Sequence, residues 1–318
     1  MIVCKFGGTC TAYPTAIKNI KTLLEESKER KVFVFSAIGK ENKQDTKMTD
    51  LLIKFADEEN REKTKEKILG KFEKLLKTTG VKFNIIRHLN KTFDEYLKTN
   101  DKEKLLSRGE YFTTFIMAKY LNIKFVPAEK ILFFDGEKID FQKSKERLEY
   151  YLNKYKRITV PGFYFCGNGR IKLFSRGGGD VSGAFCAALS NATIYENWTD
   201  VEGIFGVNPN ILKAKPIKTL SYHDLEFMTA MDANVVHAEC AKILNDTKTK
   251  LCVKSIFEPQ NQGTEISQTN KNSSSYICYK MCDDFAKIFV CERYDDYRVI
   301  LASRENYKET IKSLYENQ

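Results

Sequence analysis

Short apolar segments alternate with amphipathic segments along most of this chain. Residues 1–6 and 32–36 are apolar runs of strand length, and residues 14–28 between them carry isoleucine and leucine at helical spacing. A continuous apolar run is typical of a strand that is buried on both faces, as in a parallel sheet covered by helices. We therefore expect an α/β fold, a three-layer αβα sandwich whose central sheet is mostly parallel.

The same alternation continues to about residue 255. Further helices are expected at 49–59, 62–78, 84–98, 110–121, 180–191, 220–231 and 238–246, and further strands at 124–127, 157–160, 193–198 and 250–255, with a hairpin over 163–174. Residues 258–275 are rich in Asn, Gln, Ser and Thr and are predicted to be a linker. The tail that follows predicts three short strands and a helix near 304–316.

The charge of the chain is concentrated in one segment. The net charge is +10, and residues 60–104 contain 13 Lys and Arg against 7 Asp and Glu. Nucleic-acid binding is one interpretation of this basic helical insertion. The mixed signs, and the apolar residues that recur among them at helical spacing, favour solvated helices instead, so no nucleic-acid partner is expected.

The lengths of the apolar runs and the pattern of cysteines indicate the cellular compartment of the protein. No uncharged apolar run reaches the roughly 18 residues that a membrane helix needs, so no membrane association is expected. The nine cysteines are odd in number, lie mostly in apolar segments and contain no CxxC pair. This pattern favours reduced thiols and a cytoplasmic location over disulfides or a zinc site.

A first glycine loop follows the N-terminal strand, at Lys5–Cys10. Gly7 and Gly8 allow the backbone to approach a ligand closely, and free N–H groups in such a loop bind phosphate oxygens. Lys5, just before them, would supply positive charge to a phosphoryl group. A tight turn without a ligand remains the alternative.

A second glycine loop, Phe174–Asp180, is the strongest signal in the sequence. Three consecutive glycines separate Arg176 from Asp180, between an expected strand and an expected helix. Ordering Gly177 and Gly178 costs conformational entropy. Glycines at these positions are explained if the backbone must approach an anion there. Arg176 can hold a carboxylate, and Asp180 can orient Lys5, hold a metal ion or simply cap a helix.

Other polar residues follow expected strands or begin expected helices. Ser36 ends a strand, Thr49 is placed as a helix cap, and Glu110 is expected to open a helix, where it could hold the ammonium group of a substrate. The segment Asn197–Gly203, continuing to Phe205, suits a nucleotide pocket, although the single tryptophan in it is better explained by packing.

Together these motifs resemble those of the aspartokinases, a branch of the amino-acid kinase family. The resemblance runs from Lys5–Cys10 through Thr49–Leu52 and the second glycine loop to Gly263–Ile266, in the family's order. It implies a catalytic domain at 1–266 that transfers the γ-phosphate of ATP to the side-chain carboxylate of L-aspartate, giving 4-phospho-L-aspartate and ADP in amino-acid biosynthesis.

The resemblance also implies residue roles. Lys5 and Asp180 would be catalytic; Ser36, Thr49, Glu110, Arg176, Gly177 and Gly178 would bind aspartate; Lys5, Gly7, Gly8, Thr199, Asp200, Phe205, Asn210 and Asn234 would bind ATP. Mg²⁺ would bridge the ATP phosphates, with ligands in the protein that the sequence does not identify.

Several positions depart from the family pattern. Cys10 and Gly179 replace serines, and Asn210 and Asn234 stand where cations occur in other members. We hypothesise that one of three lysines compensates for the lost cations. These are Lys213, Lys215 and Lys242.

The family usually carries two ACT domains after the kinase domain. Residues 267–318 leave room only for a linker and a short segment, a reduced ACT-like remnant at most. We therefore expect no feedback inhibition by lysine or threonine, and a homodimer, where one forms, would use the kinase domain. Two alternatives remain open: a kinase of another amino-acid carboxylate, suggested by Gly179, and a catalytically silent binding or regulatory homologue, suggested by the lost cations.

Overall fold

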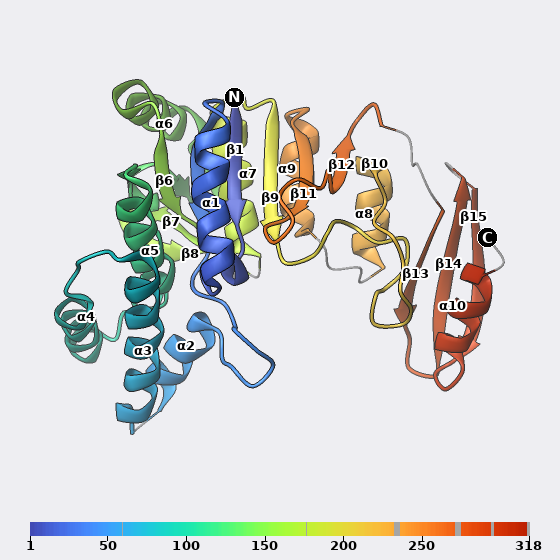
Figure 1. Ribbon diagram of the computed structural model, residues 1–318, viewed down its shortest axis with the longest axis horizontal. Helices are drawn as coiled ribbons and strands as arrows, with labels where there is room; N and C mark the ends of the chain where they lie inside the picture. The colour runs from blue at the N-terminus through green and yellow to red at the C-terminus, as the bar shows by residue number, and fades with distance from the viewer. Residues whose placement is uncertain (59, 176, 232–235, 271–274, 294–295, 317–318) are drawn as a thin grey trace.

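The computed structural model describes residues 1–58, 60–175, 177–231, 236–270, 275–293 and 296–316 (Figure 1). Its helices are Pro14–Glu26 (α1), Met48–Asp57 (α2), Glu62–Thr79 (α3), Ile85–Thr99 (α4), Lys102–Leu121 (α5), Phe141–Tyr155 (α6), Gly178–Leu189 (α7), Tyr222–Ala230 (α8), Ala238–Asp246 (α9) and Tyr307–Glu316 (α10), with short 3-10 turns at Gly8–Thr11 (η1) and Ala128–Lys130 (η2). Its strands are Ile2–Phe6 (β1), Arg30–Phe35 (β2), Lys124–Phe125 (β3), Phe133–Asp135 (β4), Lys138–Ile139 (β5), Ile158–Pro161 (β6), Tyr164–Gly167 (β7), Arg170–Leu173 (β8), Ile194–Thr199 (β9), Thr219–Ser221 (β10), Lys250–Ser255 (β11), Thr264–Ser267 (β12), Tyr276–Met281 (β13), Phe285–Arg293 (β14) and Asp296–Ser303 (β15).

The described strands form a central eight-stranded sheet in the order β10-β12-β11-β9-β1-β2-β6-β3. Its pairs are parallel except for β11 with β12, which is antiparallel. β1 lies in the middle, where Phe6 is level with Phe35 of β2 and Trp198 of β9. The carboxyl ends of these three strands therefore meet at one edge of the sheet, the lower edge in Figure 1.

Helices cover both faces of this sheet. One apolar core joins it to α1 and the α2–α5 group, and the other joins it to α6, α7, α8 and α9; α1 lies in front of the sheet and α7 behind it in Figure 1. The predicted three-layer αβα sandwich with a mostly parallel sheet is thereby confirmed. Among the described helices, none combines the length and the apolar character needed to cross a membrane.

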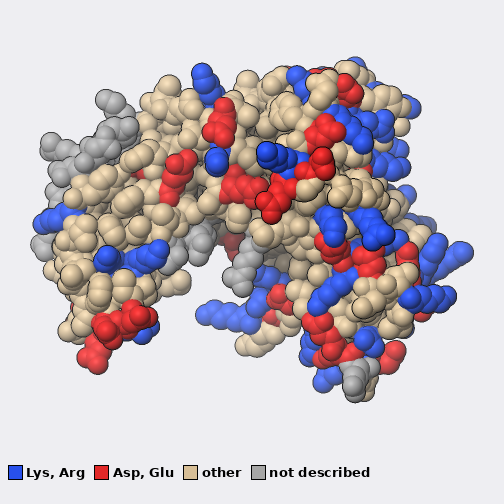
Figure 2. All heavy atoms as spheres, turned by 180° about the vertical axis from the view of Figure 1, so that it is seen from behind, with Lys and Arg blue, Asp and Glu red and all other residues tan. Residues whose placement is uncertain are grey.

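The basic insertion consists of solvated helices, and several of its lysines pair with carboxylates. Lys71 lies 2.6 Å from Asp45, and Lys102 lies 2.6 Å from Asp57. Figure 2 shows both signs of charge interspersed over this part of the molecule. Ile68 and Phe72 of α3 face inward and are fully buried, so the helical spacing of the apolar residues reflects packing.

Three sequence expectations need correction. The helix expected from residue 110 begins eight residues earlier, at Lys102, so Glu110 lies in the middle of α5. Helix α6 was not anticipated, because only Ser144 and Leu148 of its residues are buried and its apolar stripe is correspondingly thin. The expected linker contains β12, which is a strand of the central sheet.

The tail forms a compact unit, residues 276–316, called the C-terminal unit below. Strands β13, β14 and β15 make an antiparallel sheet, as the three predicted strands suggested, and α10 packs on it. This unit lies beside α8, at the far right of Figure 1. Its sheet shares a small apolar core with the segment around Val207, so it is docked on the rest of the molecule through side-chain packing.

Candidate active site

The first glycine loop lies at the carboxyl edge of the central sheet. The amide of Gly7 donates a 3.0 Å hydrogen bond to the carbonyl of Trp198, which fixes the loop to β9. A side chain at Gly8 would begin 2.7 Å from the carbonyl oxygen of Ala37, and one at Gly39 would begin 2.5 Å from the carbonyl carbon of Gly8. The backbones of these two segments therefore touch, and the glycines are required by that contact.

Lys5 and Asp180 form the charged centre of this edge. Their side chains are 2.6 Å apart and only 11% and 15% exposed. Burial disfavours the charged amine, but the nearby Asp180 carboxylate outweighs burial and raises the pKa of Lys5. Lys5 is therefore a fixed positive charge at the end of β1.

Asn197 completes this centre, and the sequence interpretation did not assign it a role. It accepts a hydrogen bond from Lys5 at 3.3 Å and donates one to Asp180, also at 3.3 Å. It is directly opposite Lys5 in the parallel pairing of β1 and β9. The relative register of the two strands, which a single sequence does not give, would have been needed to find it.

The second glycine loop opens helix α7 beside this centre. Gly177 is the residue before the helix and has φ +78°, a conformation that favours glycine. A side chain there would begin 2.4 Å from the ring of His237, and one at Gly178 would meet Phe163 and Phe174 within 3 Å. Asp180 is the third residue of α7 and not its cap, while Arg176 lies outside the described residues.

Ser36 faces Gly179 across the loop. A β-carbon at position 179 would lie 2.7 Å from Oγ of Ser36 and 3.6 Å from Cε of Lys5. The Ser36 hydroxyl thus occupies the space next to position 179, close to Lys5. One polar group is therefore present where the family pattern places the serine that this chain lacks.

Glu110 is a buried carboxyl group at the carboxyl end of β2. It is 5% exposed, and its Oε2 has no hydrogen-bond partner among the described residues. Burial raises the pKa of Glu110 to about 8, although the backbone amide of Ala37 opposes this shift. Such a group can bind a cationic ligand once it is ionised, and it is the described carboxylate best suited to an ammonium group.

Thr49 lies in the first turn of α2, and Lys47 is the residue that caps this helix. The expectation that Thr49 is the helix cap is therefore wrong. The start of this helix is held at the site because the amide of Met48 donates a 3.1 Å hydrogen bond to the carbonyl of Ile38. Thr49 is therefore near the edge that carries Ser36, through a different arrangement from the expected one.

Four of the eight residues predicted to bind ATP line one cavity. Thr199, Asp200, Phe205 and Asn210 are all part of the wall of a cavity of about 570 Å³. Asp200 accepts hydrogen bonds from Thr199 at 3.0 Å and from Thr9 at 3.4 Å, and the second of these links the cavity to the first glycine loop. Asn234 lies outside the described residues.

The tryptophan of this segment is a core residue. Trp198 is fully buried, and its indole N–H donates a 3.0 Å hydrogen bond to Glu196. Arg30 forms an ion pair with the same glutamate at 2.8 Å. The packing interpretation of Trp198 is therefore correct.

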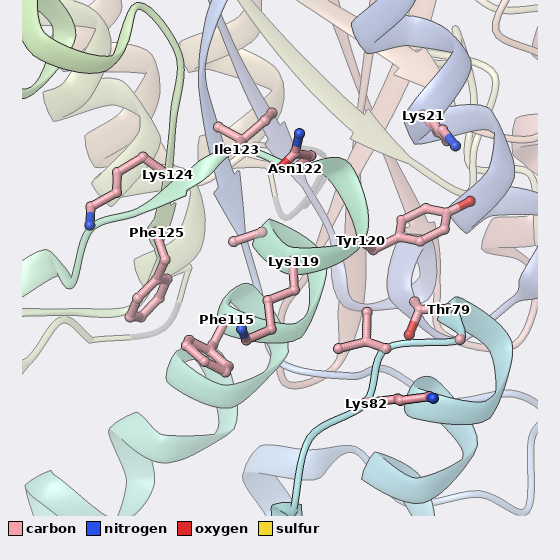
Figure 3. Close-up of a pocket in the computed structure, with 13 residues that line it drawn as sticks. Lys21, Thr79, Lys82, Phe115, Lys119, Tyr120, Asn122, Ile123, Lys124 and Phe125 are labelled. Atoms are coloured by element: carbon pink, nitrogen blue, oxygen red, sulfur yellow. The ribbon is translucent and has the colours of Figure 1, made fainter.

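Two of the lysines considered as compensating cations lie elsewhere. Lys213 and Lys215 line a different cavity, of about 610 Å³. A larger cavity, of about 850 Å³ and lined by Lys21, Lys82 and Lys119 among others, is formed by α1, α5 and residues 79–82 (Figure 3). It contains none of the residues predicted for the active site.

Carboxylates are the donor groups that this edge of the sheet offers to a metal ion. Within the described part of the chain, no three His, Cys, Asp or Glu side chains cluster so that they could hold a metal ion by themselves. Asp180 and Asp200 are separate carboxylates that contact the first glycine loop, Asp180 at Lys5 and Asp200 at Thr9. Isolated carboxylates suit Mg²⁺, which binds mainly to substrate phosphates and water with one or two protein carboxylates.

Comparison with known proteins agrees with this geometry. The chain is 27% identical over 301 residues to aspartokinase 3 of Bacillus subtilis, covering 87% of the chain and 66% of the relative. The structure matches aspartate kinase of Clostridium acetobutylicum with a TM-score of 0.81 at 30% identity, covering 90% of this chain and 67% of that one. It also shares its fold with E. coli aspartokinase III, with a TM-score of 0.73 at 20% identity and a coverage of 88% and 68%.

These matches confirm the resemblance to aspartokinases. The chain spans slightly less than two thirds of the length of the Bacillus relative. Residues 1–255 match the profile of the amino acid kinase family. This segment includes all the site residues discussed above. The chain therefore belongs to the amino acid kinase family.

Proposed function

We propose that this protein is an aspartate kinase, which transfers the γ-phosphate of ATP to the side-chain carboxylate of L-aspartate. The observation that carries the proposal is the paired Lys5 and Asp180 at the junction of two glycine loops, with the buried Glu110 nearby. The relatives of this chain are named aspartokinases, and the E. coli enzyme with the same fold was crystallised with aspartate and ADP. The catalytic domain would comprise residues 1–266.

In the proposed reaction, a carboxylate oxygen of aspartate forms a bond to the γ-phosphorus. The bond between that phosphorus and the β–γ bridging oxygen breaks, and ADP leaves with the electron pair. The attacking carboxylate is already ionised at neutral pH, so the reaction needs no general base. The protein contributes by positioning the reactants and by stabilising charge.

The phosphate side of the site would be formed by the first glycine loop. The amide of Gly8 would face the phosphates, Gly7, whose own amide is bound to Trp198, would let the backbone come close, and the ammonium of Lys5 would stabilise the charge on the transferring group. Asp180 and Asn197 would hold Lys5 in place through their contacts at 2.6 and 3.3 Å. Asp180 and Asp200 would hold Mg²⁺, which would supply charge neutralisation at the phosphates.

The acceptor side would be formed by residues of β2, α2, α5 and the second glycine loop. Glu110 would bind the ammonium of aspartate, and Arg176 would bind its α-carboxylate. Ser36, Thr49, Gly177 and Gly178 would complete this pocket. The nucleotide would lie in the 570 Å³ cavity against Thr199, Phe205 and Asn210, with Asn234 as a further contact.

The test is an assay of ADP release with and without L-aspartate, in which hydroxylamine traps the acyl phosphate as a hydroxamate. We expect ADP release to require aspartate, to yield the hydroxamate in equal amount, and to be lost in Lys5→Ala. ADP release that is independent of aspartate, or no release at all, would contradict the proposal; the second result would favour a catalytically silent homologue.

A second candidate is a kinase of a different carboxylate, and Gly179 favours it, since the acceptor pocket lacks a side chain there. The same assay with L-glutamate and with β-substituted aspartates separates the two. A larger kcat/KM for one of these compounds than for aspartate would support the second candidate.

A further inference from the structure

The C-terminal unit lines the cavity that carries the predicted nucleotide residues. The cavity is lined by Ile277, Tyr279 and Met281 of β13 together with Thr199 and Asp200. Nothing in the motifs of the kinase domain indicates this, because β13 lies outside the segment that matches the family profile. The cavity is therefore completed by a part of the chain that the proposed function does not use.

The residues that line the cavity differ in character. Thr199 and Asp200 supply polar groups, and the 3.4 Å contact of Asp200 with Thr9 links them to the first glycine loop. Other lining residues are apolar, among them Met228 of α8 and, on β13, Ile277 and Met281. A nucleotide has the same division, since its base is flat and largely apolar while its ribose and phosphates are polar.

The contact between β13 and the rest of the cavity is close and specific. The amide of Ile277 donates a 2.6 Å hydrogen bond to the carbonyl of Gly206, and a side chain at Gly206 would begin 3.0 Å from the carbonyl oxygen of Ser275. The amide group of Asn208 donates a 3.5 Å hydrogen bond to the hydroxyl of Tyr279. The strand is thus attached to the segment that carries Phe205 and Asn210.

A buried carboxylate holds the other face of the C-terminal unit. Asp224, in the first turn of α8, is fully buried and accepts hydrogen bonds from Tyr276 at 2.8 Å and from Tyr297 at 3.3 Å. The ring of Phe227 packs against Tyr297 with centroids 4.7 Å apart. Contacts on both faces therefore fix the position of β13, and the apolar wall is preformed.

We propose that β13 is the base-binding wall of the nucleotide site, with Tyr279 and Met281 as the contacts to the purine of ATP. This inference rests on the proposed function only in requiring a nucleotide, and it does not depend on which acceptor is phosphorylated. The aromatic ring of Tyr279 and the thioether of Met281 are suited to a π-face. Within the C-terminal unit, β13 is then the strand that takes part in substrate binding.

The experiment is calorimetry on the full chain with two probes, ADP and inorganic tripolyphosphate, which carries the phosphates without a base. We expect Tyr279→Ala and Met281→Ala each to weaken ADP binding by about tenfold, as loss of one base contact does, and to leave tripolyphosphate binding unchanged. Tyr279→Phe retains the ring and the packing on Tyr307, and we expect it to bind ADP within about twofold of the wild type.

Leu301→Ala is the matched control, because Leu301 is in the same unit and is 63% exposed. It should bind both probes as the wild type does. Unchanged ADP affinity in Tyr279→Ala and Met281→Ala would overturn the inference, as would an equal loss for ADP and tripolyphosphate. A wild type that binds no ADP would overturn both proposals, whereas a wild type that binds ADP but does not phosphorylate aspartate would contradict the proposed acceptor alone.

Discussion

The ammonium of Lys5 lies 2.6 Å from the carboxylate of Asp180, and Asn197 contacts both groups. The three residues come from β1, α7 and β9, so the fold brings them together from distant parts of the chain. Each of the two charged groups compensates for the burial of the other. Removal of one leaves the other with an unpaired charge in a site that is largely closed to water.

Replacement of Lys5 should abolish phosphoryl transfer without abolishing nucleotide binding. For Lys5→Met we expect kcat to fall by about 100- to 1,000-fold, the usual effect of losing one stabilising group at a transition state. ADP affinity should change much less, since the base and ribose contacts remain. Lys18→Met, at an exposed position of α1, is the control and should have wild-type kcat. A kcat within threefold of the wild type for Lys5→Met would exclude a catalytic role.

The raised pKa of Glu110 predicts a pH-dependent stability. The pKa of Glu110 is about 8 in the folded chain and near 4.5 when exposed, so the folded state binds more protons between these values. The free energy of unfolding should then decrease as the pH rises from 5 to 8, by about 1.4 kcal/mol per pH unit from this group. Urea unfolding at several pH values should show this slope, and Glu110→Gln should remove it.

The same group predicts how the KM for aspartate depends on pH. An ammonium group binds the ionised carboxylate, whose share rises from a few per cent near pH 6.5 to about one half at pH 8. The KM should therefore fall by roughly tenfold between pH 6.5 and 8, and it should be higher and independent of pH in Glu110→Gln. A wild-type KM that stays constant over this interval would show that Glu110 does not bind the substrate ammonium.

Ser36 and Gly179 should be energetically coupled. A methyl group at position 179 would lie 2.7 Å from Oγ of Ser36, but 3.9 Å from its Cβ. Gly179→Ala should therefore be more destabilising in the wild type than in Ser36→Ala, with a coupling free energy of about 1 kcal/mol in urea unfolding. Gly70→Ala, where no atom lies within 4 Å of the added group, should be additive with Ser36→Ala. Additivity at Gly179 would mean that the two positions do not interact.

Tyr276 should stabilise the attachment of the C-terminal unit. Tyr276→Phe removes the 2.8 Å hydrogen bond to Asp224 and leaves a buried carboxylate with fewer donors. We expect the free energy of unfolding to fall by about 1–3 kcal/mol. The longer 3.3 Å bond from Tyr297 provides the comparison, and Tyr297→Phe should cost less. Equal stability of Tyr276→Phe and the wild type would exclude this bond as a stabilising contact.

Much of the central sheet could be predicted because its strands are apolar and its loops contain glycine. The position of Glu110 within a helix could not, because the expected helix began at residue 110, directly after Gly109. In the structure a side chain at Gly109 would lie 3.1–3.3 Å from Ala37, Leu52 and Met48, so this glycine permits close packing of α5. Whether a glycine ends a helix or allows a neighbour to approach depends on contacts that are remote in sequence.

The contribution of β13 could not be predicted for a related reason. Tyr279 and Met281 belong to a strand with an ordinary pattern, and their importance comes from their position beside Phe205 and Met228. Asn197 was likewise within a recognised segment, yet its partner Lys5 is 192 positions away. The single sequence identified the glycine loops proposed to approach phosphate, but it did not identify the side chains that support them.

The position of β13 also has a consequence for synthesis on the ribosome. The kinase motifs emerge first, whereas the cavity wall is made of residues 276–281 and is paired with β14, which is itself paired with β15. A nascent chain that has folded through β12 would still lack this wall. Nucleotide bound in that cavity can then assist only the last stage of folding, and a chain truncated by premature termination before β13 would have the phosphate loops without a complete cavity.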